Sequence, residues 1–392
     1  MARELAFVLI NPYTIAKSRT GGVIARYTGR TDLNFVAARM FGPSEALVRE
    51  YAAYIRHAET ESPRTSELIA QYILDSYAPI AATGKRRRVM MLLFEGEDAI
   101  RKIWEVTGSA TLKEGSGQTV RDTYGDYIVG ANGEVRHFEP AVLVAPNKTR
   151  AAATLTLWAK YSAHDGGLLD RCIDVPEGSG IEKTLVMLKP DNFRTRSYRP
   201  GSIIDVLSTS GLRIIAVKKF SMTVAQAEEF YGPVRDALRK KFRDIGAPRA
   251  ASALSREFGF SMSPEVLDTI CSQVAPLFAE AQFESIVRFM TGYKPSDCTP
   301  DEKIVRGKEE CLALVYDGPE AVNKIRSILG ATDPSKASPG SVRHEFGSDV
   351  MVNAAHASDS PENAEREMRI IRVQEDTIKP WVDRYYPGGI SV

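Results

Sequence analysis

The chain has 392 residues, which is enough for two domains of ordinary size. A hydrophobic fraction of 43% and a charged fraction of 26% are typical of a globular protein, and no apolar run approaches the length that spans a bilayer. A net charge of +1 provides no field that would recruit nucleic acid or a membrane surface. We therefore expect a cytoplasmic protein without membrane or nucleic-acid partners, whose four cysteines are reduced because they lack metal-ligand and disulfide spacing: Cys172, Cys271, Cys298 and Cys311.

Two stretches of the chain repeat the same pattern. Residues 4–13 and 182–191 are both short apolar strands that end in a polar residue followed by proline. The segments that follow also correspond in order: 33–41 with 212–220, 44–55 with 223–242, and 89–96 with 311–318. The repeat predicts two copies of one fold: a domain at 1–158, a glycine-containing linker at 159–180, and a domain at 181–392.

The alternation of strands and helices within each copy is β-α-β followed by β-α-β. This pattern predicts an α+β protein with two tandem ferredoxin-like (βαββαβ) domains. Each domain would have a four-stranded antiparallel sheet, and the second would carry a helical insertion at about 243–282. A linker of this length permits either rigid pairing of the copies or some relative movement.

A histidine near the end of the chain lies in an unusual loop. The alternating run 350–352 predicts a strand that leads into His356, and Ser360 with Pro361 predicts the start of the next helix. Imidazole in such a place can act as a nucleophile, although a lone histidine at a strand end is more often a capping or surface residue. With only five histidines in the chain and no rich cluster, we predict no protein-held metal site.

Three segments together resemble the nucleoside diphosphate kinase family. The sequence Asn353-Ala-Ala-His356-Ala-Ser358-Asp-Ser resembles its active-site signature, residues 182–191 resemble its opening strand and lysine, and 329–343 resemble its phosphate-side loop. The resemblance implies transfer of the γ-phosphate of a nucleoside triphosphate to a nucleoside diphosphate. The implied mechanism is ping-pong, through a phosphohistidine at His356. Magnesium would be bound through the nucleotide phosphates.

The resemblance also implies roles for individual side chains. Glu367 would orient His356 with Ser358 beside it, and Lys189 would be a further catalytic residue. The nucleotide would be bound by Lys189, Tyr231, Phe283, Arg326, Thr332, Arg343 and Asn353. Three of these are cations, which suits the spread negative charge of phosphoryl transfer. Taken singly, each could be an ordinary structural or surface residue. A second histidine, His344, would be a bystander.

The first copy lacks most of these residues. By alignment, Asn11 replaces Lys189, Trp104 replaces Arg326, Leu143 replaces His356, and only Arg121 survives opposite Arg343. An apolar loop cannot hold a phosphoryl group, because an unpaired charge in a dry pocket is unfavourable. We interpret the first copy as a degenerate, structural domain; a site for a different ligand remains the alternative.

The second copy departs from the family pattern in two places. Ala357 stands where the family usually has glycine, which is tolerable only if its φ angle is negative. The insertion at about 243–282 precedes the family's base-stacking position, where Gln282 now stands beside Phe283. Within it, Ser263 predicts a helix that runs to Ala279. The insertion could form a lid or an assembly contact.

Three functions stay open at this stage. The leading prediction is a nucleoside-diphosphate kinase whose partners are ATP and other nucleoside di- and triphosphates. The first alternative is a catalytically weak nucleotide-binding scaffold, and the second is a histidine phosphocarrier that acts on a protein partner. The family's assembly predicts a homo-oligomer in which the two copies of one chain form an intrachain pseudo-dimer.

Overall fold

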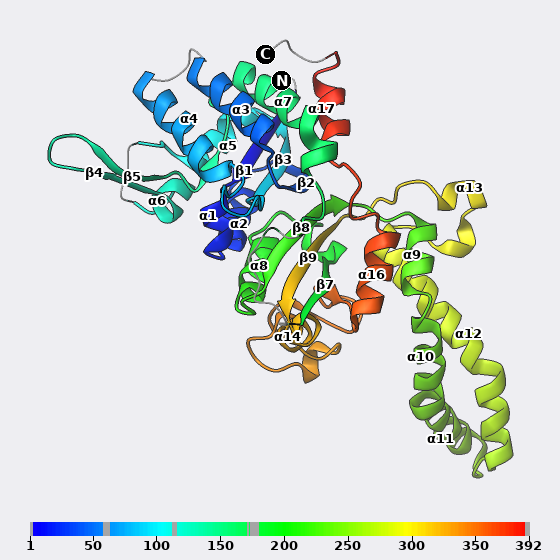
Figure 1. Ribbon diagram of the computed structural model, residues 1–392. Helices are drawn as coiled ribbons and strands as arrows, with labels where there is room; N and C mark the ends of the chain where they lie inside the picture. Colours follow the sequence, from blue (N-terminus) through cyan, green and yellow to red (C-terminus); the bar gives the residue numbers. More distant parts are fainter. Residues whose placement is uncertain (1–2, 58–62, 112–115, 171, 173–179, 389–392) are drawn as a thin grey trace. The chain divides into compact units, whose positions relative to one another are not determined.

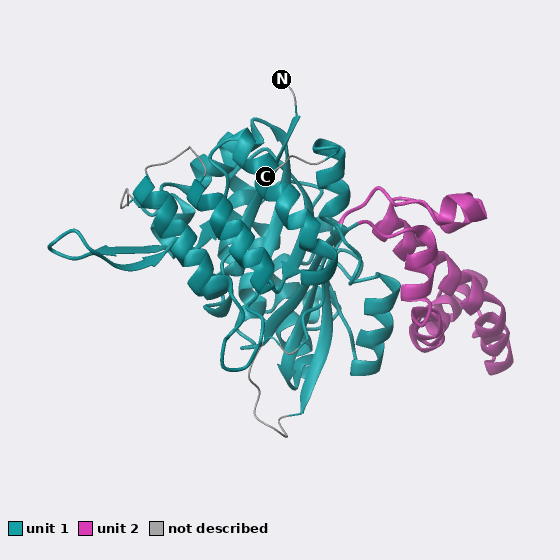
Figure 2. Ribbon diagram, turned by 45° about the horizontal axis from the view of Figure 1, so that its top comes forward, with its two compact units in different colours: residues 1–220, 311–392 teal, residues 221–310 magenta. Residues whose placement is uncertain are grey.

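The structure is a computed structural model that describes residues 3–57, 63–111, 116–170, 172 and 180–388. Part of the predicted linker, residues 171 and 173–179, lies outside the described residues. The chain divides into two compact units, shown in teal and magenta in Figure 2. Unit 1 contains residues 1–220 and 311–392, and unit 2 contains residues 221–310.

Unit 1 is built on one continuous antiparallel sheet of eight strands. Their order across the sheet is β10 (Ala355–Ala357), β7 (Ile181–Leu188), β9 (Cys311–Pro319), β8 (Arg213–Phe220), β2 (Asn34–Phe41), β3 (Val89–Glu97), β1 (Arg3–Ile10) and β6 (Val142–Leu143). A separate two-stranded hairpin is formed by β4 (Asp126–Val129) and β5 (Val135–Glu139).

The predicted combination of helices with antiparallel sheet is confirmed, but one continuous sheet is found in place of the expected pair of four-stranded sheets. The N-terminal half of unit 1 (residues 3–170) contributes the order β2-β3-β1-β6, and the C-terminal half (180–220 and 311–388) contributes β8-β9-β7-β10. The two orders correspond strand by strand. The edge strands β2 and β8 pair with each other where Arg39 faces Lys218, and this pairing makes one sheet of the two halves.

Helices cover this sheet in both halves (Figure 1). In the N-terminal half they are α1 (Pro12–Ala16), α2 (Thr20–Arg30), α3 (Glu45–His57), α4 (Pro63–Tyr77), α5 (Ala99–Thr107), α6 (Val120–Tyr124) and α7 (Lys148–Asp165). In the C-terminal half they are η1 (Pro190–Asn192), α8 (Arg199–Ser208), α14 (Ala321–Leu329), η4 (Pro334–Lys336), α15 (Val342–Phe346) and α16 (Pro361–Ile370). Helix α17 (Lys379–Tyr385) follows α16 in the sequence but packs against α7 and β1 of the N-terminal half. Helix α7 continues past residue 158, the predicted end of the first domain.

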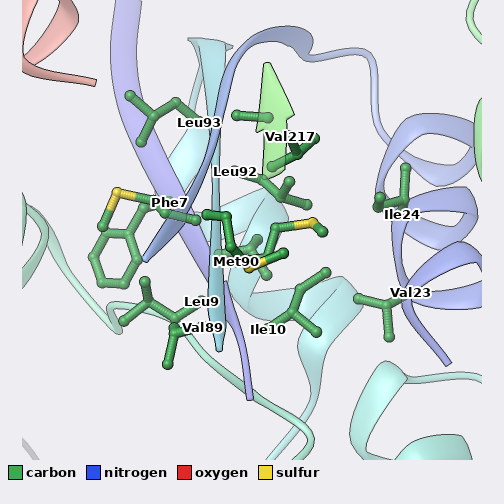
Figure 3. Close-up of a cluster of buried hydrophobic side chains, with 14 of the residues drawn as sticks. Phe7, Leu9, Ile10, Val23, Ile24, Val89, Met90, Leu92, Leu93 and Val217 are labelled. Carbon is green, nitrogen blue, oxygen red and sulfur yellow. The ribbon is translucent and has the colours of Figure 1, made fainter. Parts of the chain in front are cut away.

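The core of unit 1 forms because the central strands are apolar on both faces. All residues of β3 from Val89 to Phe94 are fully buried, and β1 is buried from Leu5 onward. Figure 3 shows their side chains meeting Val23 and Ile24 of α2, with Val217 of β8 nearby. Strands that are buried on both faces read as continuous apolar runs, which is why these segments are the clearest signals in the sequence.

Helices α2 and α8 pack against each other through glycines, and with the β2–β8 pairing they form the seam between the halves. A Cβ atom on Gly21 would lie 2.5 Å from the carbonyl oxygen of Gly201, and one on Gly201 would lie 2.3 Å from that of Gly21. The two helix backbones therefore approach closely only because both residues lack a side chain.

Two buried cations lie on the strands of this seam. Arg39 donates to the backbone carbonyls of Gln374 and Glu375, and Lys218 donates to those of Ile371 and Arg372. Burial lowers the pKa of both groups. The segment that they hold follows directly after α16, so both strands of the seam anchor the end of that helix.

Unit 2 is helical. Its elements are α9 (Val224–Tyr231), α10 (Val234–Lys241), the π-helical turn η2 (Phe242–Gly246), α11 (Ala247–Phe258), α12 (Pro264–Thr291), η3 (Pro295–Asp297) and α13 (Pro300–Lys303). Helix α12 begins next to the predicted start at Ser263 and continues beyond Ala279 to Thr291. Across the described segments of the chain, no helix combines the length and the apolar character needed to cross a membrane.

We predict that Gly201→Ala destabilises the protein by about 1–3 kcal/mol, because the new methyl group must displace the backbone of α2. Ser202→Ala, which removes a hydroxyl from the exposed side of the same helix, is the matched control. Thermal unfolding of both variants measures the effect. Equal melting temperatures for the two variants would contradict the close helix contact.

Candidate functional site

His356 lies in the middle of β10, where it pairs with Met187 of β7. Its Nε2 atom is 3.0 Å from the Oε2 atom of Glu367 on α16. Ser358 donates a hydrogen bond of 2.6 Å to the same carboxylate oxygen. Glu367 and Ser358 are buried, whereas the imidazole side chain is 23% exposed. The hydroxyl of Ser358 therefore holds the Glu367 carboxylate in position, and the carboxylate holds the imidazole of His356.

The turn that precedes β10 is held by hydrogen bonds to the end of β7. The carbonyl of Ala354, a residue with a φ of +68°, accepts from the backbone N–H of Lys189 and from the side-chain amide of Asn192. Asn192 also donates to the carbonyl of Lys189. The positive φ falls on Ala354, and Ala357 has extended strand geometry, so the alanine in place of the family's glycine is tolerated.

Asn192 was not among the predicted site residues. It is 1% exposed and holds the two chain segments that carry Lys189 and His356. The available signal in the sequence was an asparagine three residues after Lys189. If such a side chain is buried, its amide has to be hydrogen-bonded, and it can then hold neighbouring segments together. One of its two backbone partners, Ala354, is however 162 residues away in the sequence.

Lys189 lies at the end of β7 with its ammonium group buried. Its Nζ atom donates to Oδ1 of Asn353 at 2.7 Å and to the carbonyl of Met351 at 3.2 Å. Burial, with the nearby charge of Arg343, lowers the pKa of Lys189 to about 8. Asn353 donates in turn to the carbonyl of Thr332, whose residue is exposed. The predicted Lys189, Asn353 and Thr332 are thus joined by hydrogen bonds.

Arg343 on α15 and Arg326 on α14 form a second cationic group. Arg343 donates to the carbonyls of Gly330 and Ala355, so it links the loop after α14 to β10. Burial and the charge of Arg326 lower the pKa of Arg343 to about 10. Helix α14 also packs against β10. A buried guanidinium whose pKa is lowered by a neighbouring cation favours an anionic ligand between the two groups.

The remaining two predicted nucleotide-binding residues, Tyr231 and Phe283, belong to unit 2. Both are buried there, and the guanidinium of Arg235 lies 3.3 Å from the centre of the Phe283 ring. A ring covered in this way has one face occupied by a cation. Contact of these residues with a nucleotide base stays a prediction.

The N-terminal half repeats the backbone of this site with different side chains. Leu143 pairs with Leu9 as His356 pairs with Met187. Arg121 donates to the carbonyls of Gly108 and Val142, in the same pattern as Arg343. The N-terminal half keeps these two arginine hydrogen bonds although it has no imidazole. The arginine therefore has a structural role that does not require the histidine.

Asn11, the counterpart of Lys189, lies next to an acid. Its amide donates to Glu139 at 3.1 Å, and the same carboxylate accepts from Tyr72, while Tyr77 donates to the Asn11 carbonyl oxygen. Burial raises the pKa of Glu139. A carboxylate where the other half has an ammonium group disfavours a phosphate.

The Nucleoside diphosphate kinase family profile matches residues 182–245 and 302–376. A nucleoside diphosphate kinase from Bdellovibrio bacteriovorus is 30% identical over 190 residues, which are 48% of this chain and 92% of that protein. The chain belongs to the nucleoside diphosphate kinase family. The matched segments contain β7, β9, β10 and α16, which carry the candidate site.

Two further relatives agree with this assignment. The nucleoside diphosphate kinase from Symbiobacterium thermophilum is 28% identical over 211 residues, covering 53% of this chain and 100% of that protein. The enzyme of that name from Wolbachia pipientis is 31% identical over 188 residues, covering 48% of this chain and 91% of that protein. These matches span about half of the chain, and the kinase family membership predicted from the sequence is confirmed.

The donors around His356 suit a metal ion that arrives with a nucleotide. The carboxylate of Glu367 already accepts from His356 and Ser358, and that of Asp191 pairs with Arg199. In the described ranges no group of three or more histidine, cysteine, aspartate or glutamate side chains could hold a metal ion. Magnesium coordinates few protein ligands when phosphates supply its oxygens, so these residues fit a nucleotide-bound ion.

We predict that Arg121→Gln and Arg343→Gln lose similar stability, about 1–3 kcal/mol each, because each leaves two backbone carbonyls without a donor. Chemical denaturation of the two variants measures this loss. In contrast, only Arg343→Gln should weaken binding of a phosphate-bearing ligand to the C-terminal half. A large loss of stability in one variant and none in the other would contradict the shared bracing role.

Proposed function

We propose that this protein is a nucleoside-diphosphate kinase that transfers the γ-phosphate of a nucleoside triphosphate to a nucleoside diphosphate through a phosphohistidine at His356. The observation that carries the proposal is the contact of His356 Nε2 with Glu367, at 3.0 Å, supported by Ser358 on the same oxygen. A proton held on Nε2 by the carboxylate places the ring's lone pair on Nδ1, which makes that atom the nucleophile.

The first half-reaction breaks one bond and forms one. Nδ1 attacks the γ-phosphorus, the bond from phosphorus to the β,γ-bridging oxygen breaks, and the nucleoside diphosphate leaves with that electron pair. The imidazole gains positive charge as the N–P bond forms, and the Glu367 carboxylate stabilises it. A terminal oxygen of a second diphosphate then attacks the phosphorus and restores the histidine.

The cations of the site would neutralise the transferring group. Lys189, Arg326 and Arg343 supply positive charge, and the planar guanidinium groups can each bond two phosphate oxygens. Asn353 holds Lys189, and with Thr332 it is proposed to provide neutral hydrogen bonds to the nucleotide. Magnesium, bound through the nucleotide phosphates, would supply further charge neutralisation. Tyr231 and Phe283 are also proposed to bind nucleotide.

The arrangement of the halves supports an assembly proposal as well. The corresponding strand orders, the shared sheet and the α2–α8 contact are what two copies of one fold would produce if they paired within a chain. We therefore propose that the N-terminal half is a degenerate copy, so that each chain forms a pseudo-dimer, and that whole chains associate further. The molecular mass in solution tests the association.

The decisive experiment is labelling with γ-³²P-ATP and magnesium, followed by addition of a different nucleoside diphosphate. We predict an acid-labile, base-stable label on the full chain that moves into the new triphosphate. His356→Ala should abolish the label. His344→Ala is the matched control, because the His344 imidazole hydrogen-bonds the backbone carbonyl of Ala337, and the variant should be labelled normally.

Each other outcome identifies an alternative. A label that forms on His356 but does not move to a nucleoside diphosphate would favour a phosphocarrier that acts on a protein partner. No label, with nucleotide still bound, would favour a nucleotide-binding scaffold. A label that persists in His356→Ala would overturn the assignment of the nucleophile and direct attention to the N-terminal half.

We predict that nucleotide binding becomes weaker as the pH rises above about 8, because the pKa of Lys189 is lowered to about 8 in the empty site. Below this pH the group is charged before the ligand binds. Above it, binding must take up a proton, so affinity should fall by up to about tenfold per pH unit until the pH approaches the ordinary lysine value.

Isothermal titration at pH 8.5 in two buffers of different ionisation enthalpy measures this proton uptake. Lys189→Arg is the control, because a guanidinium stays charged throughout this window and should show no uptake. The sign is opposite for folding: the buried charge is unfavourable below pH 8, and this penalty on folding stability is relieved as the pH rises from about 8 towards 10.5. Equal proton uptake by both proteins would exclude Lys189 as its source.

A further inference from the structure

A cavity of about 90 Å³ lies at the seam of unit 1, remote in sequence from the His356 loop. Residues of the N-terminal half line one side of it, including Ser18, Thr20 and Arg88. Residues of the C-terminal half line the other side, including Ser208, Arg213 and Tyr316. We call this space the seam cavity. Neither half encloses it alone.

Three residues that line the seam cavity each carry a buried polar atom without a hydrogen-bond partner in the described part of the chain. These atoms are Oγ1 of Thr20, Nη2 of Arg213 and the hydroxyl of Tyr316. Thr20 is 2% exposed and Tyr316 is 1% exposed. Buried polar groups are nearly always hydrogen-bonded, and each exception calls for a missing partner. Three exceptions that line one cavity point to one shared partner.

The charge around the seam cavity is positive. Arg213 forms an ion pair with Asp317 at 2.9 Å, which accounts for one of the two guanidinium charges. Arg88 donates to the carbonyl of Ile214, a neutral group, and its burial lowers its pKa. Helix α2 also begins at this cavity, since Thr20 and Gly21 are its first residues and both line it. The first N–H groups of a helix have no intrahelical partners and favour an anion.

We propose that the seam cavity binds a small tetrahedral oxyanion, inorganic phosphate, between the two halves of unit 1. All three unpartnered groups can donate hydrogen bonds, and a guanidinium nitrogen can only donate. An oxyanion with several acceptor oxygens satisfies such a set, and its charge balances Arg88. The volume admits an ion of this size but not a nucleotide. The bound ion would join Thr20 of one half to Arg213 and Tyr316 of the other.

The seam position gives the ion a structural effect. It bridges α2, which packs on α8, and β9, which pairs with β8. A ligand that binds the joined halves and not the separated ones stabilises the joined state by mass action. Phosphate should therefore raise the melting temperature of unit 1 through a site that is separate from His356.

The test is a titration of inorganic phosphate into the full-length protein at constant ionic strength, followed by thermal unfolding and calorimetry. Phosphate can also bind the cations near His356, so the measurements are made in an Arg326→Gln background, which weakens binding there. In that background we expect a phosphate-dependent rise in melting temperature. Tyr316→Phe, which removes only the hydroxyl, should weaken the apparent affinity by about tenfold.

Two further variants keep the test decisive. Thr20→Val removes the second hydroxyl from the opposite half and should weaken phosphate binding in the same direction. Tyr27→Phe is the matched control, because Tyr27 is another buried tyrosine of unit 1 whose hydroxyl already bonds Thr107 at 2.6 Å. It should lower basal stability while leaving the phosphate affinity unchanged.

Several outcomes would overturn the proposal. Equal phosphate affinity in the Arg326→Gln protein with and without Tyr316→Phe would place the ion elsewhere. A complete absence of a phosphate effect in the Arg326→Gln background would mean that the seam cavity holds only water. If acetate raised the melting temperature as much as phosphate does, the seam cavity would be a site for a carboxylate and not for a tetrahedral oxyanion.

Discussion

The pairing of a short edge strand with the first strand of each half is the constraint on which the site depends. Strand β10 has only three residues, yet its register on β7 decides that His356 faces Met187. The hydrogen bond from the backbone N–H of Lys189 to the carbonyl of Ala354 helps to hold the strand in place. The two hydrogen bonds that Arg343 donates, to the carbonyls of Gly330 and Ala355, do the same. In the N-terminal half, β6 lies on β1 with the same bonds, from Asn11 to Ala141 and from Arg121 to Val142.

This comparison separates what the fold needs from what the chemistry needs. An arginine that braces the edge strand is kept in both halves, so its presence alone does not indicate a phosphate site. The imidazole, the ammonium group and the second arginine are present only in the C-terminal half. Their replacements in the N-terminal half, Leu143, Asn11 and Trp104, remove an imidazole and two cations. There, Glu139 adds a buried carboxylate. The two sites therefore carry different polar and charged side chains although their backbones correspond.

The N-terminal half lacks the counterparts of His356, Lys189 and Arg326, but its contacts at the seam still support the C-terminal half. Arg39 and Lys218 hold the segment that follows α16, and α16 carries Glu367. Buried cations tolerate low dielectric surroundings only when carbonyls or carboxylates surround them. These contacts therefore tie the N-terminal half to the helix that orients the histidine. At the same seam, α2 and α8 can pack closely only if Gly21 and Gly201 carry no side chain.

The sequence by itself determined the family, the mixed α/β character and the apolar strands, because these depend on local patterns and on a motif with fixed spacing. The residues of the His356 loop could be selected in advance for the same reason. Their partners could not all be found: Asn192 contacts Ala354 across the fold, and Arg39 contacts the chain more than 330 residues later. Only the tertiary structure decided that eight strands form one sheet, because edge-strand pairing leaves no periodic signal. It alone also placed Thr20, Arg213 and Tyr316 around one cavity, since burial and the loss of hydrogen-bond partners arise only when distant segments pack together.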